Sequence, residues 1–362
     1  MLICLVGPQC AGKRQVADYL AHRCSFTRIG IVGRAETADV SGLSNELGLI
    51  KVDSEGDSSN TLVFKDATAA LSYVTAHWET HFVVQDLGTL AARPSFNWSE
   101  WSKRPFVLLV SIHAPTLVRF SRFRYAPHRK SHTKFNPAKS YQTLSTNLSL
   151  FKLMHQAHFT INNPFKTKDE LFTVLEQSNL TDPNRTRPNW DLYFLKLCDL
   201  AASRSNCMKR RVGCVVTKDR RVVATGYNGT PAGLRNCNEG GCKRCNEGIA
   251  RMGNGLEMCI CLHAEENALL EAGRERISTG SKTILYCNTC PVEFLLFDGL
   301  SKTEYLIEIL NEQCVQCARK IIQLGINEVV YSQSYGMDSI TIRLFGEAGI
   351  VMRQVVQMAT CV

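Results

Sequence analysis

The first half of the chain has a hydrophobic pattern typical of strands that alternate with helices. Residues 1–6, 81–86 and 105–112 form apolar runs whose length fits buried parallel strands. Directly after the first run, apolar residues between positions 16 and 20 recur at helical spacing. Strands alternating with helices predict an α/β domain built on a parallel sheet.

The second half repeats this alternation in shorter pieces. Residues 190–200 have helical spacing, and residues 212–216 and 222–229 are strand-like runs joined by a turn. Further strands are expected at 283–287 and 329–331, a helix at 314–322, and a helix end followed by a last strand at 346–351. The polar, proline-bearing segment 179–188 separates the halves, so we expect domains at residues 1–180 and 181–362.

Length and composition add limits to this pattern. The 362 residues are enough for two domains with cores of ordinary size. No apolar run approaches the ~20 residues that span a bilayer, and the opening run lacks the basic start and cleavage site of a signal peptide. We therefore expect a soluble protein without a membrane partner, located in the cytoplasm, with the nucleus as a second compartment.

The net charge of +9 is unevenly distributed along the chain. Residues 101–168 contain twelve Lys or Arg residues and no Asp or Glu. Such a stretch suggests an anionic partner, such as nucleotide phosphate, RNA or an acidic protein surface, or else a solvated face that binds nothing specific. These alternatives stay open, although we do not expect nucleic acid to be the partner.

A glycine loop follows the first predicted strand. Gly7, Gly12 and Lys13 have the G-x-x-x-x-G-K spacing, in which backbone N–H groups and a lysine bind phosphates at a helix N-terminus. The next residue should be Ser or Thr to hold magnesium, but it is Arg14. Phosphoryl transfer is therefore in doubt, whereas nucleotide binding is still permitted.

Two further features of this half resemble nucleoside and nucleotide kinases. Asp86 ends a predicted strand, where a carboxylate could bind magnesium. A group of basic residues resembles the basic lid of these kinases: Arg119, Arg122, Arg124, Arg129 and Lys130. The resemblance leaves three readings of the first domain, namely an active kinase, a degenerate nucleotide-binding domain and a scaffold.

The sixteen cysteines are concentrated in the second half, since only three of them precede residue 190. Without a secretion signal, this clustering favours reduced thiols and metal sites over a disulfide framework. Residues 237–245 and 259–261 hold thiols in C-x2-C and C-x-C spacing, which predicts a structural zinc. Its ligands need not be contiguous, because Cys207 lies on a segment that could approach the same loop.

A second group of residues predicts a catalytic zinc. His263 and Glu265 lie two residues apart at the start of a predicted helix, so an imidazole and a carboxylate can face the same metal-bound water. Cys314 and Cys317 form a C-x-x-C pair at the start of another helix, whose positive end favours thiolates. His-x-Glu completed by Pro-Cys-x-x-Cys is the arrangement of zinc deaminases.

Several motifs in order now point to one family. They are RPNWDLYF, RSNC leading to VG, TGYNGTPAGLRNCNEGGC, LHAEENALLEAGR, TCP, CVQCARKIIQLG and EVVYSQSYGMD. Residues 187–362 closely resemble deoxycytidylate deaminases, especially the fungal type with a kinase-like N-terminal domain. The resemblance implies a mixed sheet between helices and zinc-dependent deamination of dCMP to dUMP. It also implies regulation by dCTP and dTTP and a hexamer as the homo-oligomer.

The resemblance also assigns roles to residues. It implies His263, Cys314 and Cys317 as ligands of the catalytic zinc and Glu265 as the group that moves protons. It places Asn228 at the sugar and Tyr335 near the base or the phosphate. For a second zinc it implies Cys207 and Cys261, to which we add Cys242 and Cys245 in preference to Cys237. Alternatives are a catalytically silent nucleotide-binding protein and a deaminase of another cytosine or adenine substrate.

One departure from the family pattern is large. Residues 292–313, twenty-two in number, separate Pro291 from Cys314, whereas the family has Pro directly before Cys-x-x-Cys. A retained intron explains this, because the segment is in frame, Val codons begin with GT and one Gln codon ends in AG. The alternatives are a loop extruded at the surface and a zinc ion drawn to the wrong pair, Cys287 and Cys290.

Overall fold

The computed structural model of the chain describes nine segments, residues 1–31, 49–50, 61–91, 96–125, 150–247, 259–277, 282–293, 312–335 and 339–356. Two compact units divide between Arg187 and Pro188. This division lies a few residues after the predicted boundary, because the 3-10 helix η1 (Pro183–Arg185) packs on the first unit. There the Arg185 guanidinium lies 4.3 Å from the centroid of the Phe159 ring. None of the described helices has the length and apolar character needed to span a membrane.

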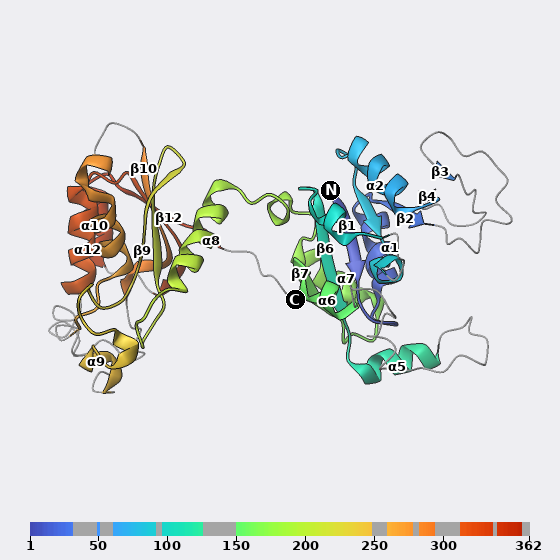
Figure 1. Ribbon diagram of the computed structural model, residues 1–362, viewed down its shortest axis with the longest axis horizontal. Helices are drawn as coiled ribbons and strands as arrows, with labels where there is room; N and C mark the ends of the chain where they lie inside the picture. The colour runs from blue at the N-terminus through green and yellow to red at the C-terminus, as the bar shows by residue number, and fades with distance from the viewer. Residues whose placement is uncertain are drawn as a thin grey trace. The chain divides into compact units, whose positions relative to one another are not determined.

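The first unit is a mostly parallel sheet between helices (Figure 1). Its strands are β1 (Leu2–Val6), β2 (Thr27–Ile31), β3 (Leu49–Ile50), β4 (Thr61–Phe64), β5 (Phe82–Val84), β6 (Val107–His113) and β7 (Phe159–Asn162), in the order β3-β4-β2-β5-β1-β6-β7. Its helices are α1 (Lys13–Arg23), α2 (Ala67–Ala76), α3 (Leu87–Ala91), α4 (Trp98–Ser102), α5 (Thr116–Arg124), α6 (Leu150–His155) and α7 (Lys168–Ser178). All pairs are parallel except β3 with β4.

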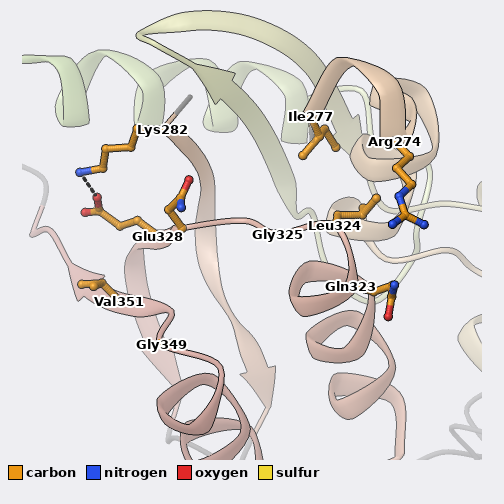
Figure 2. Close-up of a pocket in the computed structure, with 10 residues that line it drawn as sticks. Arg274, Ile277, Lys282, Gln323, Leu324, Gly325, Glu328, Gly349 and Val351 are labelled. Atoms are coloured by element: carbon orange, nitrogen blue, oxygen red, sulfur yellow. Dashed lines mark ion pairs between the residues drawn. The ribbon is translucent and has the colours of Figure 1, made fainter. Parts of the chain in front are cut away.

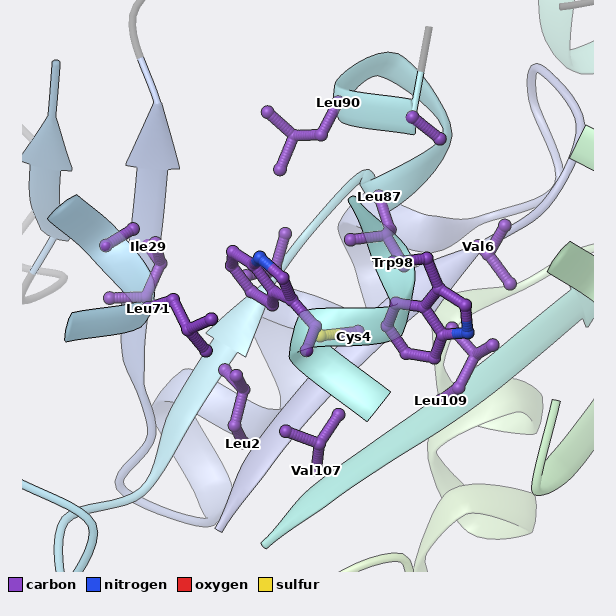
Figure 3. Packing of buried hydrophobic residues seen from close by; sticks show 14 of the residues in the cluster. Leu2, Cys4, Val6, Ile29, Leu71, Leu87, Leu90, Trp98, Val107 and Leu109 are labelled. Atoms are coloured by element: carbon purple, nitrogen blue, oxygen red, sulfur yellow. The ribbon is translucent and has the colours of Figure 1, made fainter. Parts of the chain in front are cut away.

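The side chains of alternate β1 residues pack in two separate hydrophobic cores, as expected for a strand covered on both faces. Leu2, Cys4 and Val6 pack with residues of α2, α3, α4 and α6 (Figure 3). Ile3 and Leu5 pack on the other face with residues of α1 and α7. This explains why the opening run is apolar at every position.

The second unit is a mixed sheet of five strands. They are β8 (Gly213–Lys218), β9 (Arg221–Tyr227), β10 (Thr283–Glu293), β11 (Glu328–Tyr335) and β12 (Val351–Gln354), in the order β12-β11-β10-β8-β9. The helices are α8 (Trp190–Ala202), α9 (Lys243–Asn246), α10 (Ala264–Ile277), α12 (Glu312–Gln323) and α13 (Ser339–Glu347), with the 3-10 helix η2 (Cys237–Glu239). The β10 strand pairs in parallel with β11 and in antiparallel with β8.

Helices cover both faces of this sheet (Figure 1). On one face α8 packs through Phe194 and Leu195 against Tyr286 and Val330. On the other face α10 and α12 lie side by side over the inward residues of β8 and β10. The predicted α/β fold class is confirmed, since one sheet is mostly parallel and the other mixed, whereas the P-loop kinase character of the first unit stays a prediction.

Candidate active site and metal centre

A short bridge places the start of α10 beside the end of β9. Gly229 and Leu262 exchange backbone hydrogen bonds of 2.8 and 3.2 Å, so His263 directly precedes the first turn of α10. Close packing makes this possible, since a Cβ on Gly226 would lie 2.3 Å from the Ala264 carbonyl oxygen. The helix start is therefore held against the sheet where only glycine fits.

Glu265 is buried on the sheet side of α10, with 3% of its surface exposed. Its Oε1 accepts a hydrogen bond from the Cys287 thiol of β10 across 3.2 Å. Burial, and then the charge of Glu265, raises the pKa of Cys287, so this thiol stays protonated and can donate. A buried carboxylate held by a weak donor remains available to exchange protons with a ligand.

His263 and Cys317 supply a nitrogen and a sulfur beside this carboxylate. His263 Nδ1 lies 3.4 Å from Cys317 Sγ, and one ligand atom from each of His263, Glu265 and Cys317 lies within 4.8 Å of the others. Cys314 is one turn before Cys317 in α12, but its side chain falls outside what the structure describes, as does that of Tyr335. Mixed nitrogen and thiolate donors fit zinc.

An ion pair joins the two helices that carry these groups. Lys320 Nζ of α12 binds Glu266 Oε1 of α10. Glu266 follows Glu265, and Lys320 lies one turn after Cys317, so the pair fixes α12 relative to the His263 turn. Sequence reasoning missed it, because the pairing depends on how the helices pack.

Asn228 directly follows β9 and binds the loop that follows α8. Its Oδ1 accepts hydrogen bonds from Val212 N (2.8 Å) and Ser205 Oγ (2.7 Å), and its Nδ2 donates to Arg210 O (2.9 Å). An Asn amide has two donor and two acceptor positions. Among the described residues three of the four have partners, which leaves one N–H of the amide without one.

Six cysteines gather beside the active-site helix. Cys237, Cys242 and Cys245 are buried, and Cys207, Cys259 and Cys261 pack against them partly buried. They form two groups of four thiols: Cys207, Cys237, Cys245 and Cys261 in one, and Cys242, Cys245, Cys259 and Cys261 in the other. The structure thus brings the four predicted ligands into one cluster, with Cys237 and Cys259 in addition.

Comparisons with known proteins agree with this site. The model of the "Cytidine and deoxycytidylate deaminase zinc-binding region" matches residues 188–333. A deoxycytidylate deaminase of Schizosaccharomyces pombe is 39% identical over 97% of this chain and 96% of its own length. The chain belongs to the deoxycytidylate deaminase family. The deoxycytidylate deaminase of Saccharomyces cerevisiae is 42% identical over 70% of this chain and 76% of its own length.

A solved structure is also similar to this deoxycytidylate deaminase family member. It is that of dCMP deaminase from the cyanophage S-TIM5 in apo form, at 22% sequence identity. The match covers 47% of this chain and 99% of that chain, with a TM-score of 0.30.

The predicted phosphate loop of this family member lies between β1 and α1. Gly12 has a φ of +108°, a left-handed conformation, and caps α1 without a side-chain hydrogen bond. Lys13 Nζ donates to Gly7 O at 2.6 Å and lies 3.3 Å from the Asp86 carboxylate. Asp86 therefore lies beside the loop, whereas its proposed part in magnesium binding stays a prediction.

Two of the arginines assigned to a basic lid face the protein instead. Arg119 is fully buried and donates to Ala114 O at 3.1 Å. Arg122 donates to the carbonyl oxygens of Ala11 (3.3 Å) and Phe165 (2.7 Å), so it holds the glycine loop 7–13 against the segment that follows β7. Arg129 and Lys130 lie outside the described residues.

The second unit contains a cavity of about 760 Å³ (Figure 2). None of His263, Glu265 and Cys317 lines it. Arg274 and Ile277 line it from the end of α10, whereas His263 precedes the start of that helix. The helix is interrupted at Gly273, and its regular part from Ala264 to Ala272 alone spans roughly 12 Å at ~1.5 Å per residue. Lys282 and Glu328 form an ion pair of 2.9 Å on the wall of the cavity, which is therefore no part of the His263 site.

Proposed function

We propose that the chain catalyses the zinc-dependent hydrolysis of dCMP to dUMP and ammonia, supplying dUMP for dTMP synthesis. The grouping of His263, Glu265 and Cys317 within 4.8 Å carries this proposal. A carboxylate beside nitrogen and sulfur ligands is the donor set of zinc deaminases. The names of the two fungal relatives support the same substrate.

The protein's own groups move the protons. Glu265 would accept a proton from water as the oxygen attacks C4 of cytosine. It would then deliver protons to the ring nitrogen and to the leaving amine, so one water is consumed and one ammonia is released. Because Glu265 is buried, bulk water has little access to the proton between these transfers.

The remaining residues would hold the metal and the substrate. His263, Cys314 and Cys317 are the proposed zinc ligands. When bound, the zinc acts as a Lewis acid that lowers the pKa of the attacking water to about 7. The unused amide N–H of Asn228 would donate to a sugar hydroxyl, and Tyr335 at the end of β11 would lie near the base or the phosphate.

Replacing Glu265 tests the proposal. We expect Glu265→Gln to lower kcat for dCMP by about 10²–10⁴-fold, the range for general acid–base groups, while the zinc content is unchanged. Glu271→Gln is the matched control, because Glu271 lies on the same helix but is exposed. Equal activity of the Glu265→Gln protein and the unmodified chain would refute the proposed role.

We also propose that the first unit binds nucleotide phosphates without transferring them. The left-handed Gly12 at the start of α1 and the adjacent Lys13 and Asp86 support binding, and Arg14 argues against a magnesium-dependent transfer. Calorimetry with ATP, dCTP and dTTP on the full chain tests this. Lys13→Ala should weaken binding at least about tenfold, whereas Lys103→Ala, an exposed lysine of the same unit, should not.

Regulation by dCTP and dTTP and a hexameric assembly remain predictions from the family resemblance. Activity measured at low dCMP should change in opposite directions when dCTP and dTTP are added separately. Sedimentation of the active protein should give six copies. A monomer insensitive to both nucleotides would contradict both predictions.

A further inference from the structure

Two thiols belong to both groups of the six-cysteine cluster. Cys245 and Cys261 are common to the two, whereas Cys207 and Cys237 complete one group and Cys242 and Cys259 complete the other. This is the connectivity of two tetrahedra that share an edge. One metal centre would have four ligands, and two centres sharing two ligands would need all six.

The sulfur positions fit tetrahedral metal coordination. Zn–S bonds of ~2.3 Å place neighbouring sulfurs of a tetrahedron ~3.8 Å apart. Cys207 Sγ and Cys245 Sγ are 4.0 Å apart, and all sulfurs within each group lie within 4.8 Å of one another. All six cysteines are free thiols, so no disulfide competes for these positions.

We propose that the six cysteines bind two zinc ions as one cluster, with Cys245 and Cys261 bridging both ions. Cys207 and Cys237 are the terminal ligands of one ion, and Cys242 and Cys259 are those of the other. The inference goes beyond the proposed deaminase activity and does not depend on it. It replaces a single ion held by Cys207, Cys242, Cys245 and Cys261.

Backbone amides surround the sulfurs as they do in thiolate metal sites, where N–H donors offset the ligand charge. Met208 N donates to Cys237 Sγ at 3.5 Å. The backbone N–H groups of Lys209 and Arg210 point to Cys207, and that of Cys261 points to Cys259. Two zinc ions and six thiolates together keep two negative charges.

Positive side chains lie where this residual charge would be. The charge of Arg244 acts on Cys259. Lys243 and Arg244 form the first turn of α9, directly after Cys242. All six thiols are buried or partly buried in one cluster. A single ion would use four of them and leave two buried thiols beside it without a metal.

The cluster connects three segments that reach the active site. Cys207 follows Ser205, whose hydroxyl binds Asn228, and Cys261 lies two residues before His263. Cys237, Cys242 and Cys245 come from the η2–α9 segment. Because metal binding orders the ligands and the loops that carry them, the two ions would fix the Asn228 loop relative to the His263 turn.

Cadmium NMR tests the shared thiolates directly. The full chain is stripped of metal under reducing conditions and reconstituted with ¹¹³Cd, which replaces zinc in thiolate sites. We expect two resonances from all-sulfur sites that are coupled to each other through the bridging sulfurs, together with one resonance from a mixed nitrogen and sulfur site. A single uncoupled all-sulfur resonance, or none, would overturn the proposal.

Variants separate this cluster from the catalytic site. His263→Ala should remove the mixed-ligand resonance and keep the coupled pair, so a failure of the deaminase assignment leaves the cluster test intact. Cys259→Ala should abolish the coupling and lower the all-sulfur metal content from two to one. Cys214→Ala, a buried cysteine of β8 outside the cluster, is the control and should keep the coupled pair. Coupling that persists in Cys259→Ala would exclude Cys259 as a ligand and overturn the two-ion cluster.

Discussion

The Cys287 thiol donates a hydrogen bond to the Glu265 carboxylate across 3.2 Å, between the middle of β10 and the first turn of α10. Both side chains are buried, so the bond is shielded from water. It gives the carboxylate one fixed partner, and within the described part of the chain no hydrogen bond to its other oxygen is seen. Cys287 therefore acts as a positioning residue for the proposed proton carrier.

We predict that Cys287→Ala lowers kcat for dCMP about threefold to tenfold with little change in KM. A hydrogen bond to a charged group contributes roughly 1.5–3 kcal/mol, and a thiol, as a weak donor, contributes less than that. Steady-state kinetics measures the split. Cys214→Ala is the control, since Cys214 pairs with Cys287 across β8 and β10 and is equally buried. Equal losses in both variants would mean that packing, and not the hydrogen bond, matters.

The sequence allowed much of this site to be predicted because its key residues are close along the chain. His263 directly precedes α10 and Glu265 lies two residues later in its first turn, so their spacing alone predicts a common target. The role of Cys287 could not be predicted, because it depends on which face of β10 meets α10. The strand periodicity is consistent with it, since Leu285 and Cys287 pack in the same core.

The cysteine cluster shows the limit of spacing arguments. The C-x2-C and C-x-C patterns indicated metal, yet they could not show which thiols group together. Cys207, Cys237 and Cys259 come from three separate segments, and only their packing brings them to Cys245 and Cys261. The fold class, by contrast, could be predicted from local sequence pattern. A fully apolar run such as β1 directly indicates a strand that is covered on both faces.

The insertion at residues 292–313 leads to a second prediction. In the structure β10 extends to Glu293 and α12 begins at Glu312, so the two ends of the insertion belong to elements that flank the site. Residues 294–311 lie outside the described part. Zinc ligands need placement within about 0.5 Å. We expect a chain without residues 292–313 to deaminate dCMP and bind the catalytic zinc better than the full chain.

Activity and zinc content of the two chains, measured side by side, decide this prediction. Transcript reads that join Pro291 directly to Cys314 would independently support a retained intron. Full activity of the 362-residue chain would instead show that the segment is a tolerated loop. Zinc bound through Cys287 and Cys290, a possibility raised by their spacing, would appear as zinc in excess of the six-cysteine cluster's content that persists in a Cys317→Ala variant.

A third prediction concerns the contact between β9 and α10. A Cβ on Gly226 would lie 2.3 Å from Ala264 O and 2.4 Å from Ala268 N, and these backbone atoms cannot move unless the helix moves. Gly226→Ala should therefore cost about 2–3 kcal/mol of unfolding free energy and displace Glu265, lowering kcat. Urea denaturation and dCMP kinetics measure both effects.

Gly346→Ala is the matched control for this substitution. Gly346 lies within α13 and has no atom within 4 Å of a built Cβ. Replacing a glycine by alanine inside a helix should stabilise the protein by about 0.5–1 kcal/mol. Destabilisation by both variants would show that the close approach at Gly226 is not the cause.

The last prediction concerns acid stability and rests on Arg353 of β12. Its guanidinium binds the Asp191 carboxylate at 2.6 Å and that of Glu328 at 2.7 Å. Lys282 also faces Glu328, and the Tyr286 hydroxyl donates to Asp191. Burial opposes ionisation of both acids, but these hydrogen bonds and charges outweigh it and lower the pKa of Asp191 and Glu328 below their ordinary values of 3.8 and 4.5.

The sign follows from these lowered pKa values. As the pH falls, these two carboxyls take up protons in the unfolded chain before they do so in the folded one. Their contribution to folding stability is therefore complete above about pH 5.5. It is lost as the pH falls through the folded pKa values, which lie below 4.5 for Glu328 and below 3.8 for Asp191. Arg353→Met should cost about 1–2 kcal/mol at pH 6.5 and less at pH 3.5. Arg343→Met is the control, because the Arg343–Glu347 pair is exposed on both sides and should contribute little at either pH. A cost of Arg353→Met that stays the same at pH 3.5 would mean that this arginine stabilises the fold by packing and not by its charge.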